Sequence, residues 1–379
     1  MEPIQAPIVK KVEVGQVEAY LNDPTKLVVV QTAPAVRVSL GEFFGMPVGT
    51  VVTGKMVASL KALGFKAVFD TDLGADITIW EEAMEFLKKV QNNGPYPLFN
   101  SCCIGWLMQA RNNYSDLIPL ISTAKSPVGM LGSVVKTYYA QKANWDPKDI
   151  VVVSVVPCIL KKQEAQLPFN TTNGLYDVDI SLTTKDLAGM IAEKKLDFAS
   201  LPDQPFDNPL GESTGGGTIF GRSGGVLEAA IRTAYYWYDK TIDPKPLDFK
   251  VSSLSSDIME APIHLAGKDL WVAHTGLIGV KKIAQLIRAD LCPYAFVEVM
   301  ACPGGCIMGA GQPIHLPKEG IDNRQIRELR RQALNGIDQK QPRRVSALNP
   351  DVNRVYNILF DSKAGSEKAE VQLHRSYNK

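Results

Sequence analysis

The stretch DIVVVSVVPC, residues 149–158, is a nearly continuous run of β-branched apolar residues that ends on a cysteine. A run of this kind is typical of a strand buried on both faces, as in a parallel sheet covered by helices. The same character recurs in KLVVVQTA (26–33), KAVFDTD (66–72), DLWVAHTG (269–276) and AFVEVMAC (295–302). Helical segments separate these runs, which predicts an α/β fold with largely parallel sheets.

The length of 379 residues and a hydrophobic content of 45% are enough for more than one lobe. We expect two lobes, each with a mostly parallel β-sheet flanked by helices, and an active site in the cleft between them. Ligands of such sheets bind at the carboxyl ends of the strands. The predicted segments are an N-terminal extension (1–25), a first α/β lobe (26–148), a second α/β lobe with two of the three cysteine motifs (149–313) and a C-terminal helical arm (314–379).

The charge balance argues against two classes of partner. The chain has 41 basic and 40 acidic residues, a net charge of +1, so no long-range field attracts nucleic acid or an anionic membrane surface. The N-terminal stretch MEPIQAPIVKKVEVGQ has no apolar signal core, and no run of about 18 apolar residues could span a bilayer. We therefore expect a soluble, cytoplasmic protein with no nucleic-acid or membrane partner.

Six cysteines are present, and in a reducing cytoplasm they indicate metal binding or redox chemistry more than disulfides. Five of them fall in three short segments: FNSCCIGW (99–106), VVPCILKKQE (155–164) and ACPGGCIMGAGQP (301–313). Taken singly, the first two segments can equally be small thiols that fill a core. Cys292 stands alone and is expected to be a buried structural thiol.

The three segments together favour an inorganic cluster. Neighbouring side chains of an extended chain point opposite ways, so Cys102 and Cys103 are not expected to bind the same metal, and one of them stays a free thiol. The glycines of ACPGGCIMGAGQP let the backbone approach an inorganic core and expose N–H groups to its sulfurs. Four thiolates fit an iron–sulfur cubane. Zinc is the competing interpretation, although none of the four histidines lies in these segments.

The three segments resemble the signature motifs of the iron-only (FeFe) hydrogenases. The family patterns read approximately Thr-Ser-Cys-Cys-Pro-x-Trp, Met-Pro-Cys-x-x-Lys-x-x-Glu and Met-Ala-Cys-x-x-Gly-Cys-x-x-Gly-x-Gly-Gln-Pro. The chain has NSCCIGW, VPCILKKQE and MACPGGCIMGAGQP in the same order. The likeness extends through TAPAVRVSLGE, GADITIWEEAMEFL, STAKSPVGMLGS, TGGGTIFGRSGGVLEAA and GSEKAEVQLHRSY, and so covers nearly the whole chain from about residue 27.

The resemblance implies a set of cluster ligands and a pocket. A four-iron, four-sulfur (4Fe-4S) cubane would be held by Cys103, Cys158, Cys302 and Cys306. Cys306 would also bridge to a two-iron (2Fe) subcluster that bears carbonyl (CO), cyanide (CN) and a bridging dithiolate amine, and the two parts form the H-cluster. Lys161 would donate a charge-assisted bond to one cyanide. The remaining pocket residues would be Ala33, Pro34, Ser126, Pro127, Phe220 and Met300.

The resemblance also implies a proton relay to solvent, made up from the inside outward of Cys102, Glu82, Ser122 and Glu85. Read without it, TIWEEAMEFLKKVQNN (78–93) predicts a helix that begins at a Thr78–Glu81 capping box and carries Glu82, Glu85 and Lys89 on one face. A solvated charged stripe is the ordinary interpretation of such a face. Carboxylates also suit proton transfer, because burial raises their pKa values.

The activity that the resemblance implies is the reversible reduction of protons to dihydrogen. No cysteine precedes Cys102, so a minimal form is expected, with a ferredoxin or similar external electron carrier and with maturation proteins that supply the two-iron unit. The chain departs from the family pattern at Ala35, Asn100, Ile104, Val128 and Val156, which makes the predicted pocket more apolar. The alternative is a hydrogen- or redox-sensing or iron–sulfur assembly relative with little turnover, and the retained relay residues favour the enzyme.

Overall fold

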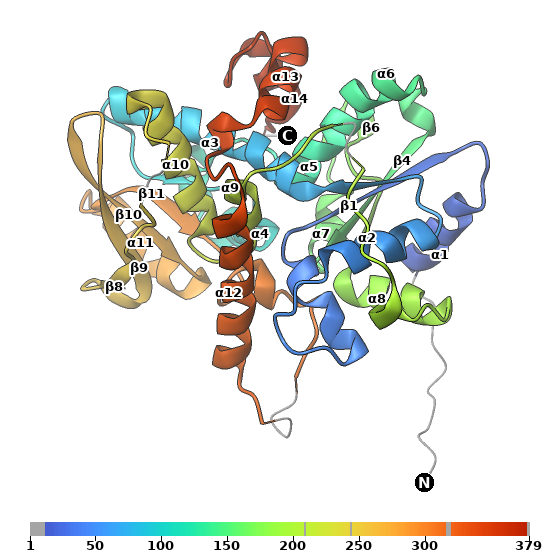
Figure 1. Cartoon of the computed structure of the whole chain (residues 1–379). Helices are drawn as coiled ribbons and strands as arrows, with labels where there is room; N and C mark the ends of the chain where they lie inside the picture. Colours follow the sequence, from blue (N-terminus) through green and yellow to red (C-terminus); the bar gives the residue numbers. More distant parts are fainter. Residues whose placement is uncertain (1–11, 208–209, 243–244, 316–319, 377–379) are drawn as a thin grey trace.

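The computed structural model describes residues 12–207, 210–242, 245–315 and 320–376, and two β-sheets form its framework (Figure 1). Sheet A has the strand order β2 (Ala67–Asp70), β1 (Leu27–Thr32), β4 (Ile150–Val156) and β7 (Ile180–Thr183), and all of its pairings are parallel. Strands β1 and β4 are buried along their whole length. The predicted α/β class and these two buried strands are therefore confirmed.

Sheet B is parallel on one side and antiparallel on the other. Its order is β3 (Leu98–Phe99), β11 (Tyr294–Val299), β10 (Lys268–Thr275), β9 (Ser255–Leu265) and β8 (Lys250–Ser252). The first three strands run parallel, whereas β9 and β8 form an antiparallel edge. Sheet B thus departs from the expected mostly parallel arrangement at β9 and β8. Antiparallel strands such as these can be joined by hairpins, without a crossover helix.

The boundary predicted between residues 148 and 149 does not separate the two lobes. Strand β4 follows that boundary but pairs with β1 in sheet A, and β3 precedes it but pairs with β11 in sheet B. Parallel strands need long crossover connections, and here those connections carry the chain from one sheet to the other and back. The predicted extension 1–25 contains helix α1 (Val12–Leu21), while residues 1–11 lie outside the described residues.

Helices cover both sheets and fill the space between them (Figure 1). The longer ones before the C-terminal arm are α2 (Thr53–Ala62), α3 (Thr71–Gln91), α4 (Ile104–Asn113), α5 (Pro127–Val134), α8 (Thr184–Glu193), α10 (Gly225–Asp239) and α11 (Leu277–Arg288). Short elements are α6 (Ala140–Ala143), α7 (Lys161–Glu164), α9 (Gly215–Thr218), β5 (Thr171–Thr172) and β6 (Leu175–Tyr176). Among the residues described, no helix combines the length and the apolar character needed to cross a membrane.

Helix α3 runs from the end of β2 to the start of β3 and so links the two sheets. It begins directly after β2, where the side chain of Asp70 accepts a hydrogen bond from the amide of Asp72 (3.0 Å). The predicted start at Thr78 is therefore wrong, and Thr78 lies inside the helix with its hydroxyl on the carbonyl of Gly74 (3.1 Å). Gly74 lets α3 touch α5, because a Cβ there would lie 2.2 Å from the carbonyl oxygen of Pro127.

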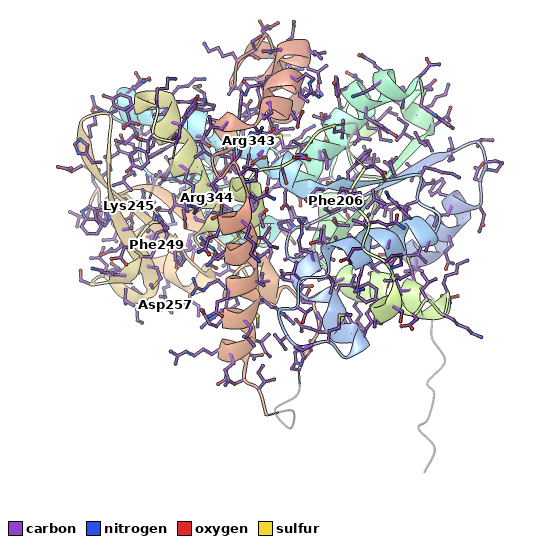
Figure 2. All side chains as sticks on the ribbon, viewed as in Figure 1. Phe206, Lys245, Phe249, Asp257, Arg343 and Arg344 are labelled. Atoms are coloured by element: carbon purple, nitrogen blue, oxygen red, sulfur yellow. The ribbon has the colours of Figure 1, made fainter. Side chains whose placement is uncertain are left out.

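The C-terminal arm consists of α12 (Asn323–Lys340), α13 (Pro350–Leu359) and α14 (Glu367–Leu373); of the predicted segment, residues 316–319 and 377–379 lie outside the described residues. Helix α12 stands between the two sheets in Figure 1. The ion pair of Arg330 with Glu42 (2.5 Å) is buried at both ends and ties α12 to the lobe of sheet A. Asp338 pairs with Arg232 of α10 and with Arg344, which Figure 2 labels beside α12. The arm is thus part of the core assembly.

Candidate active site

All three cysteine motifs follow the carboxyl ends of parallel strands. Cys102 and Cys103 come after β3, Cys158 after β4, and Cys302 and Cys306 after β11. The sites therefore lie where ligands bind in open parallel sheets, but the strands belong to both sheets. Motifs more than a hundred residues apart in sequence are brought to one place by this arrangement.

The four predicted ligand thiols influence one another electrostatically, which shows that they converge. Burial first, and then the neighbouring thiols of Cys103, Cys158 and Cys302, raise the pKa of Cys306 well above its usual value. Burial, with Cys158 and Cys103 as neighbours, raises the pKa of Cys302 to about 11. The pKa of Cys103 is raised by burial and, less strongly, by Cys158. Thiolates in this position would need a compensating cation.

The backbone around the thiols is shaped for an anionic core. Gly304 and Gly305 have φ values of +98° and +90°, and a Cβ at Gly305 would lie 2.5 Å from the amide nitrogen of Ser223. Only glycine adopts this conformation at so close an approach. The amide of Ala301 donates to the Sγ of Cys103 (3.3 Å). Backbone N–H groups aimed at cysteine sulfur are the contacts that iron–sulfur centres use.

Among the residues described, no group of three or more His, Cys, Asp or Glu side chains is placed to hold one metal ion. A zinc site needs its thiolates within about 2.3 Å of one centre, whereas a cubane spreads the four over its corners. Four thiols drawn from three segments suit the larger core.

An apolar pocket adjoins the thiols. Its walls include Cys103, Cys158 and Cys306 and seven of the residues predicted for it: Ala33, Pro34, Cys102, Pro127, Lys161, Phe220 and Met300. Ala35, Val128 and Val156 also line it, so these three departures from the family pattern do face the cavity. Thr71, Ala75, Pro157 and Gly221 complete the wall, and the sequence analysis gave none of them a role in the pocket.

Ser126 does not line this pocket. Its side chain hydrogen-bonds to Glu164, and it borders a smaller neighbouring cavity together with Lys161. The expected pocket contact is therefore not what the structure shows, because Ser126 precedes the first turn of α5 and turns toward the carboxylate of α7.

Lys161 is the cation of the pocket wall. Its Nζ donates to the carbonyl oxygen of Cys102 (3.0 Å) and forms an ion pair with Glu164. Glu164 also pairs with Arg375 of the C-terminal segment (3.3 Å). One carboxylate thus orients two cations, and an anion bound in the pocket would meet the ammonium group of Lys161.

Cys102 is a fifth thiol beside these four, and burial first, then Glu82, Cys103 and Cys306, raises its pKa well above the usual value. It is 7% exposed and lines the pocket, and Asn100 donates to its Sγ (3.3 Å). The amide of Asn100 is oriented by its own Oδ1, which accepts from the backbone of Val299 (2.8 Å). Asn100 was recognised in the sequence only as a departure from the family pattern; the structure makes it a direct partner of Cys102.

Glu82 and Glu85 lie on the buried side of α3, behind Cys102. Burial raises the pKa of Glu82 to about 8, with Glu85 adding to the shift. The Oε1 of Glu82 accepts from the amide and hydroxyl of Ser101 (3.0 and 3.2 Å), and its Oε2 is buried without a hydrogen-bond partner. Burial also raises the pKa of Glu85, which receives a hydrogen bond from Ser122. The predicted helix face is therefore buried, and the solvated-stripe interpretation is wrong for Glu82 and the carboxyl of Glu85.

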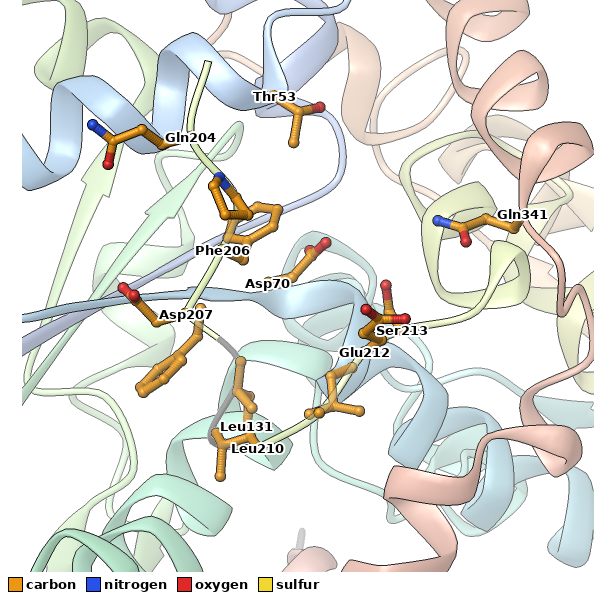
Figure 3. Close-up of a pocket in the computed structure, with 14 residues that line it drawn as sticks. Thr53, Asp70, Leu131, Gln204, Phe206, Asp207, Leu210, Glu212, Ser213 and Gln341 are labelled. Carbon is orange, nitrogen blue, oxygen red and sulfur yellow. The ribbon is translucent and has the colours of Figure 1, made fainter. Parts of the chain in front are cut away.

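A second pocket lies away from the cysteines, on the side of sheet A. Figure 3 shows that Asp70, Phe206, Asp207 and Glu212 surround it. None of its lining residues is a cysteine or a predicted site residue.

Family models match most of the chain. Residues 26–310 match the C-terminal domain of the iron only hydrogenase large subunit, and residues 324–379 match the iron hydrogenase small subunit. The periplasmic Fe hydrogenase large subunit of Nitratidesulfovibrio vulgaris is 46% identical over 79% of this chain and 72% of its own length. Iron hydrogenase 1 of Clostridium pasteurianum is 38% identical over 99% of this chain, which spans 65% of that relative.

The fold is shared with solved structures of the same family. A structure of an FeFe hydrogenase from Chlamydomonas reinhardtii superposes with a TM-score of 0.85 at 35% identity, covering 96% of this chain and 98% of that one. A relative of a different kind, a cytosolic Fe-S cluster assembly factor of Xenopus tropicalis, is 30% identical over 93% of this chain and 74% of its own length. The family models and the hydrogenase relatives together show that the chain belongs to the iron-only hydrogenase family.

Proposed function

We propose that this protein is an FeFe hydrogenase that interconverts protons and dihydrogen at an H-cluster, with electrons from an external carrier. This proposal is carried by one apolar pocket, which is lined by Cys103, Cys158 and Cys306 together with a fifth thiol, Cys102, and a cation, Lys161. Glu82 and Glu85, two carboxyls whose pKa values burial raises, stand behind Cys102. An iron–sulfur scaffold without proton chemistry would not need either feature.

The donor set fits the 4Fe-4S cubane and its two-iron partner. Cys103, Cys158, Cys302 and Cys306 would hold the cubane, and Cys306, the one of the Cys302–Cys306 pair that borders the pocket, would face the two-iron unit. When bound, the cluster supplies an open iron site and a nearby amine base for heterolytic chemistry on dihydrogen. Lys161 would neutralise the anionic ligands of that unit, and the apolar walls would exclude water from it.

The protein's own contribution is a supply of protons. A carboxyl with a pKa of about 8 is mostly protonated at neutral pH, so Glu82 is able to donate a proton toward Cys102. The thiol of Cys102 then faces the pocket and would carry the proton the last step. Glu85 and Ser122 would reload Glu82 from the outside.

Electrons would enter on the opposite side of the cubane. A broad groove beside Cys302 is lined by Pro303, Gly304, Arg327 and Arg331, together with Phe249 and Asp257, which Figure 2 labels on the lobe of sheet B. A ferredoxin or similar carrier that docks there would come close to the cubane without crossing the proton route. Maturation proteins would insert the two-iron unit.

The similarity to an iron–sulfur assembly factor favours a second candidate, a relative that binds a cluster but turns over little or no hydrogen. Infrared spectra after loading with a synthetic two-iron cofactor distinguish the two, because carbonyl and cyanide bands require an intact pocket. Hydrogen evolution with reduced viologen then tests turnover, with Cys102→Ala as the inactive variant and Cys292→Ala as the matched control at a thiol remote from the motifs. Absence of both bands and hydrogen in the wild-type protein would support the assembly relative.

A further inference from the structure

The outer end of the proton route is not defined by the residues that the family motifs supply. Glu85 is half-buried, and its Oε2 is buried without a hydrogen-bond partner. Lys89, one helical turn further along α3, donates to the carbonyl oxygen of Pro95 (2.9 Å) and not to Glu85. The hydrogen-bonded groups around the other carboxylate oxygen of Glu85 therefore decide where the route reaches solvent.

A polar chain leads from Glu85 to the C-terminal segment. The hydroxyl of Thr123 lies 3.5 Å from the Oε1 of Glu85 and 2.8 Å from the Nδ1 of His374. The same Nδ1 lies 3.6 Å from the Oε2 of Glu370 on α14. The side chain of His374 is 4% exposed and that of Glu370 is 48% exposed, so one short hydrogen bond, flanked by two longer contacts, joins a buried carboxyl to the surface.

The histidine is held in this geometry by groups from α3, from α13 and from the turn between α13 and α14. Its Nε2 contacts the Oε2 of Glu81 (3.0 Å), and Glu81 is fixed in turn by the amide of Gly365 (2.8 Å) and by the hydroxyl of Tyr356 on α13. Burial alone would lower the pKa of His374, but Glu81 and, less strongly, Glu85 and Glu370 raise it above 6.5. The ring is thus able to accept a proton at Nδ1 while Nε2 stays anchored.

We propose that Thr123, His374 and Glu370 form the outer segment of the proton relay and join Glu85 to solvent. This inference rests on the proposed function. Glu370 takes a proton from hydronium in the solvent and passes it to Nδ1 of His374. The imidazolium then gives that proton to the oxygen of Thr123 while the hydroxyl proton of Thr123 moves to Glu85. Once the Thr123 hydroxyl has rotated back, Thr123, His374 and Glu370 are in their starting states, Glu85 holds one more proton to pass inward, and nothing is oxidised or reduced.

The ion pair of His374 with Glu81 also holds the C-terminal segment against α3. A variant that breaks this pair could therefore lose activity through the structure alone. The decisive variants therefore leave that pair intact. Thr123→Val removes the hydroxyl, Thr123→Ser restores it, and Glu370→Gln removes the exposed carboxylate. Glu367→Gln, an exposed glutamate one turn earlier on α14, is the matched control.

Two measurements on the full chain test the route. In the loaded enzyme, Thr123→Val and Glu370→Gln are expected to lower the kcat of hydrogen evolution about tenfold or more at unchanged KM for viologen, since a positioned proton-transfer group contributes at least this much. Thr123→Ser and Glu367→Gln should keep the wild-type kcat. Before the two-iron unit is inserted, infrared spectroscopy should show slower deuterium exchange of the buried carboxyl band in Thr123→Val than in the wild type.

Wild-type kcat and wild-type exchange in both Thr123→Val and Glu370→Gln would overturn the inference while leaving the hydrogenase assignment in place. If the loaded wild-type protein evolves no hydrogen, the proposed function fails, and the deuterium exchange still decides whether Thr123 carries protons to Glu85.

Discussion

Replacing Glu82 by Gln should change the pH dependence of stability as well as turnover. Burial raises the pKa of Glu82 from 4.5 to about 8 in the folded protein. In the unfolded chain the carboxyl ionises near its ordinary value, whereas the folded protein keeps its proton until about pH 8. The folded state therefore binds more protons across this window, so its stability falls as pH rises from 4.5 toward 8.

The size of the effect follows from the difference between the two pKa values. A pKa that rises from 4.5 to about 8 corresponds to roughly 5 kcal/mol of penalty for the ionised form, spread over that window. Glu82→Gln cannot ionise and lacks this component. The free energy of unfolding of the variant minus that of the wild type should thus increase with pH by about this amount, because the titrating groups that do not interact with Glu82 cancel in the difference. Turnover should fall by roughly 10²–10⁴-fold, as for a lost proton-transfer group.

The assay is guanidinium unfolding of both proteins, followed by circular dichroism at several pH values. Glu298→Gln is a matched control: burial raises the pKa of Glu298 to about 7, so the same sign and a smaller change are expected, without the loss of turnover. A difference between Glu82→Gln and wild type that stays flat with pH would refute the reasoning, since it would mean that Glu82 ionises equally in both states.

Three further changes test the site. Cys102→Ala should nearly abolish turnover and leave cluster loading intact, as the carbonyl bands would report. Lys161→Met should weaken retention of an anionic two-iron unit by about 2 kcal/mol, the contribution of a charged hydrogen bond; Lys162→Met, whose ammonium pairs with α1 and α8 neighbours outside the pocket, should retain it normally. Gly74→Ala should destabilise the fold by about 1–3 kcal/mol in urea unfolding, because its Cβ would lie 2.2 Å from a backbone carbonyl of α5.

The strands that carry the site were predictable because their sequences are locally unambiguous. β1 and β4 are buried on both faces and read as unbroken apolar runs. β9 is different: it mixes buried and exposed residues and includes Pro262, so its sequence does not distinguish a strand from a loop. The pairing of β4 with β1 was not predictable either, since pairing depends on where the crossover helices place each strand.

Helix α3 shows how burial overrides a local signal. A capping-box pattern fits Thr78 and Glu81, but the helix is already formed from Thr71, and nearly all its residues before Ala83 are buried. A helix that is buried on all sides has no polar face, so its sequence does not show which side packs against the core or where the helix begins. The motif thiols were found from the sequence through long, specific motifs. Asn100, Ser101 and Thr123 were not assigned roles, because a hydrogen bond between distant segments leaves no periodic trace.

The cluster thiols hang from both sheets, with Cys158 after β4 and Cys302 and Cys306 after β11. An iron–sulfur cluster bound by all four thiols would link the two sheets. Its binding free energy would therefore add to the free energy of unfolding of the whole protein. Removal of the iron should therefore weaken the contact between the two sheets before it unfolds either sheet. A protease should then cut the cluster-free protein in the segments that connect the two sheets, and it should do so faster than it cuts the cluster-bound protein.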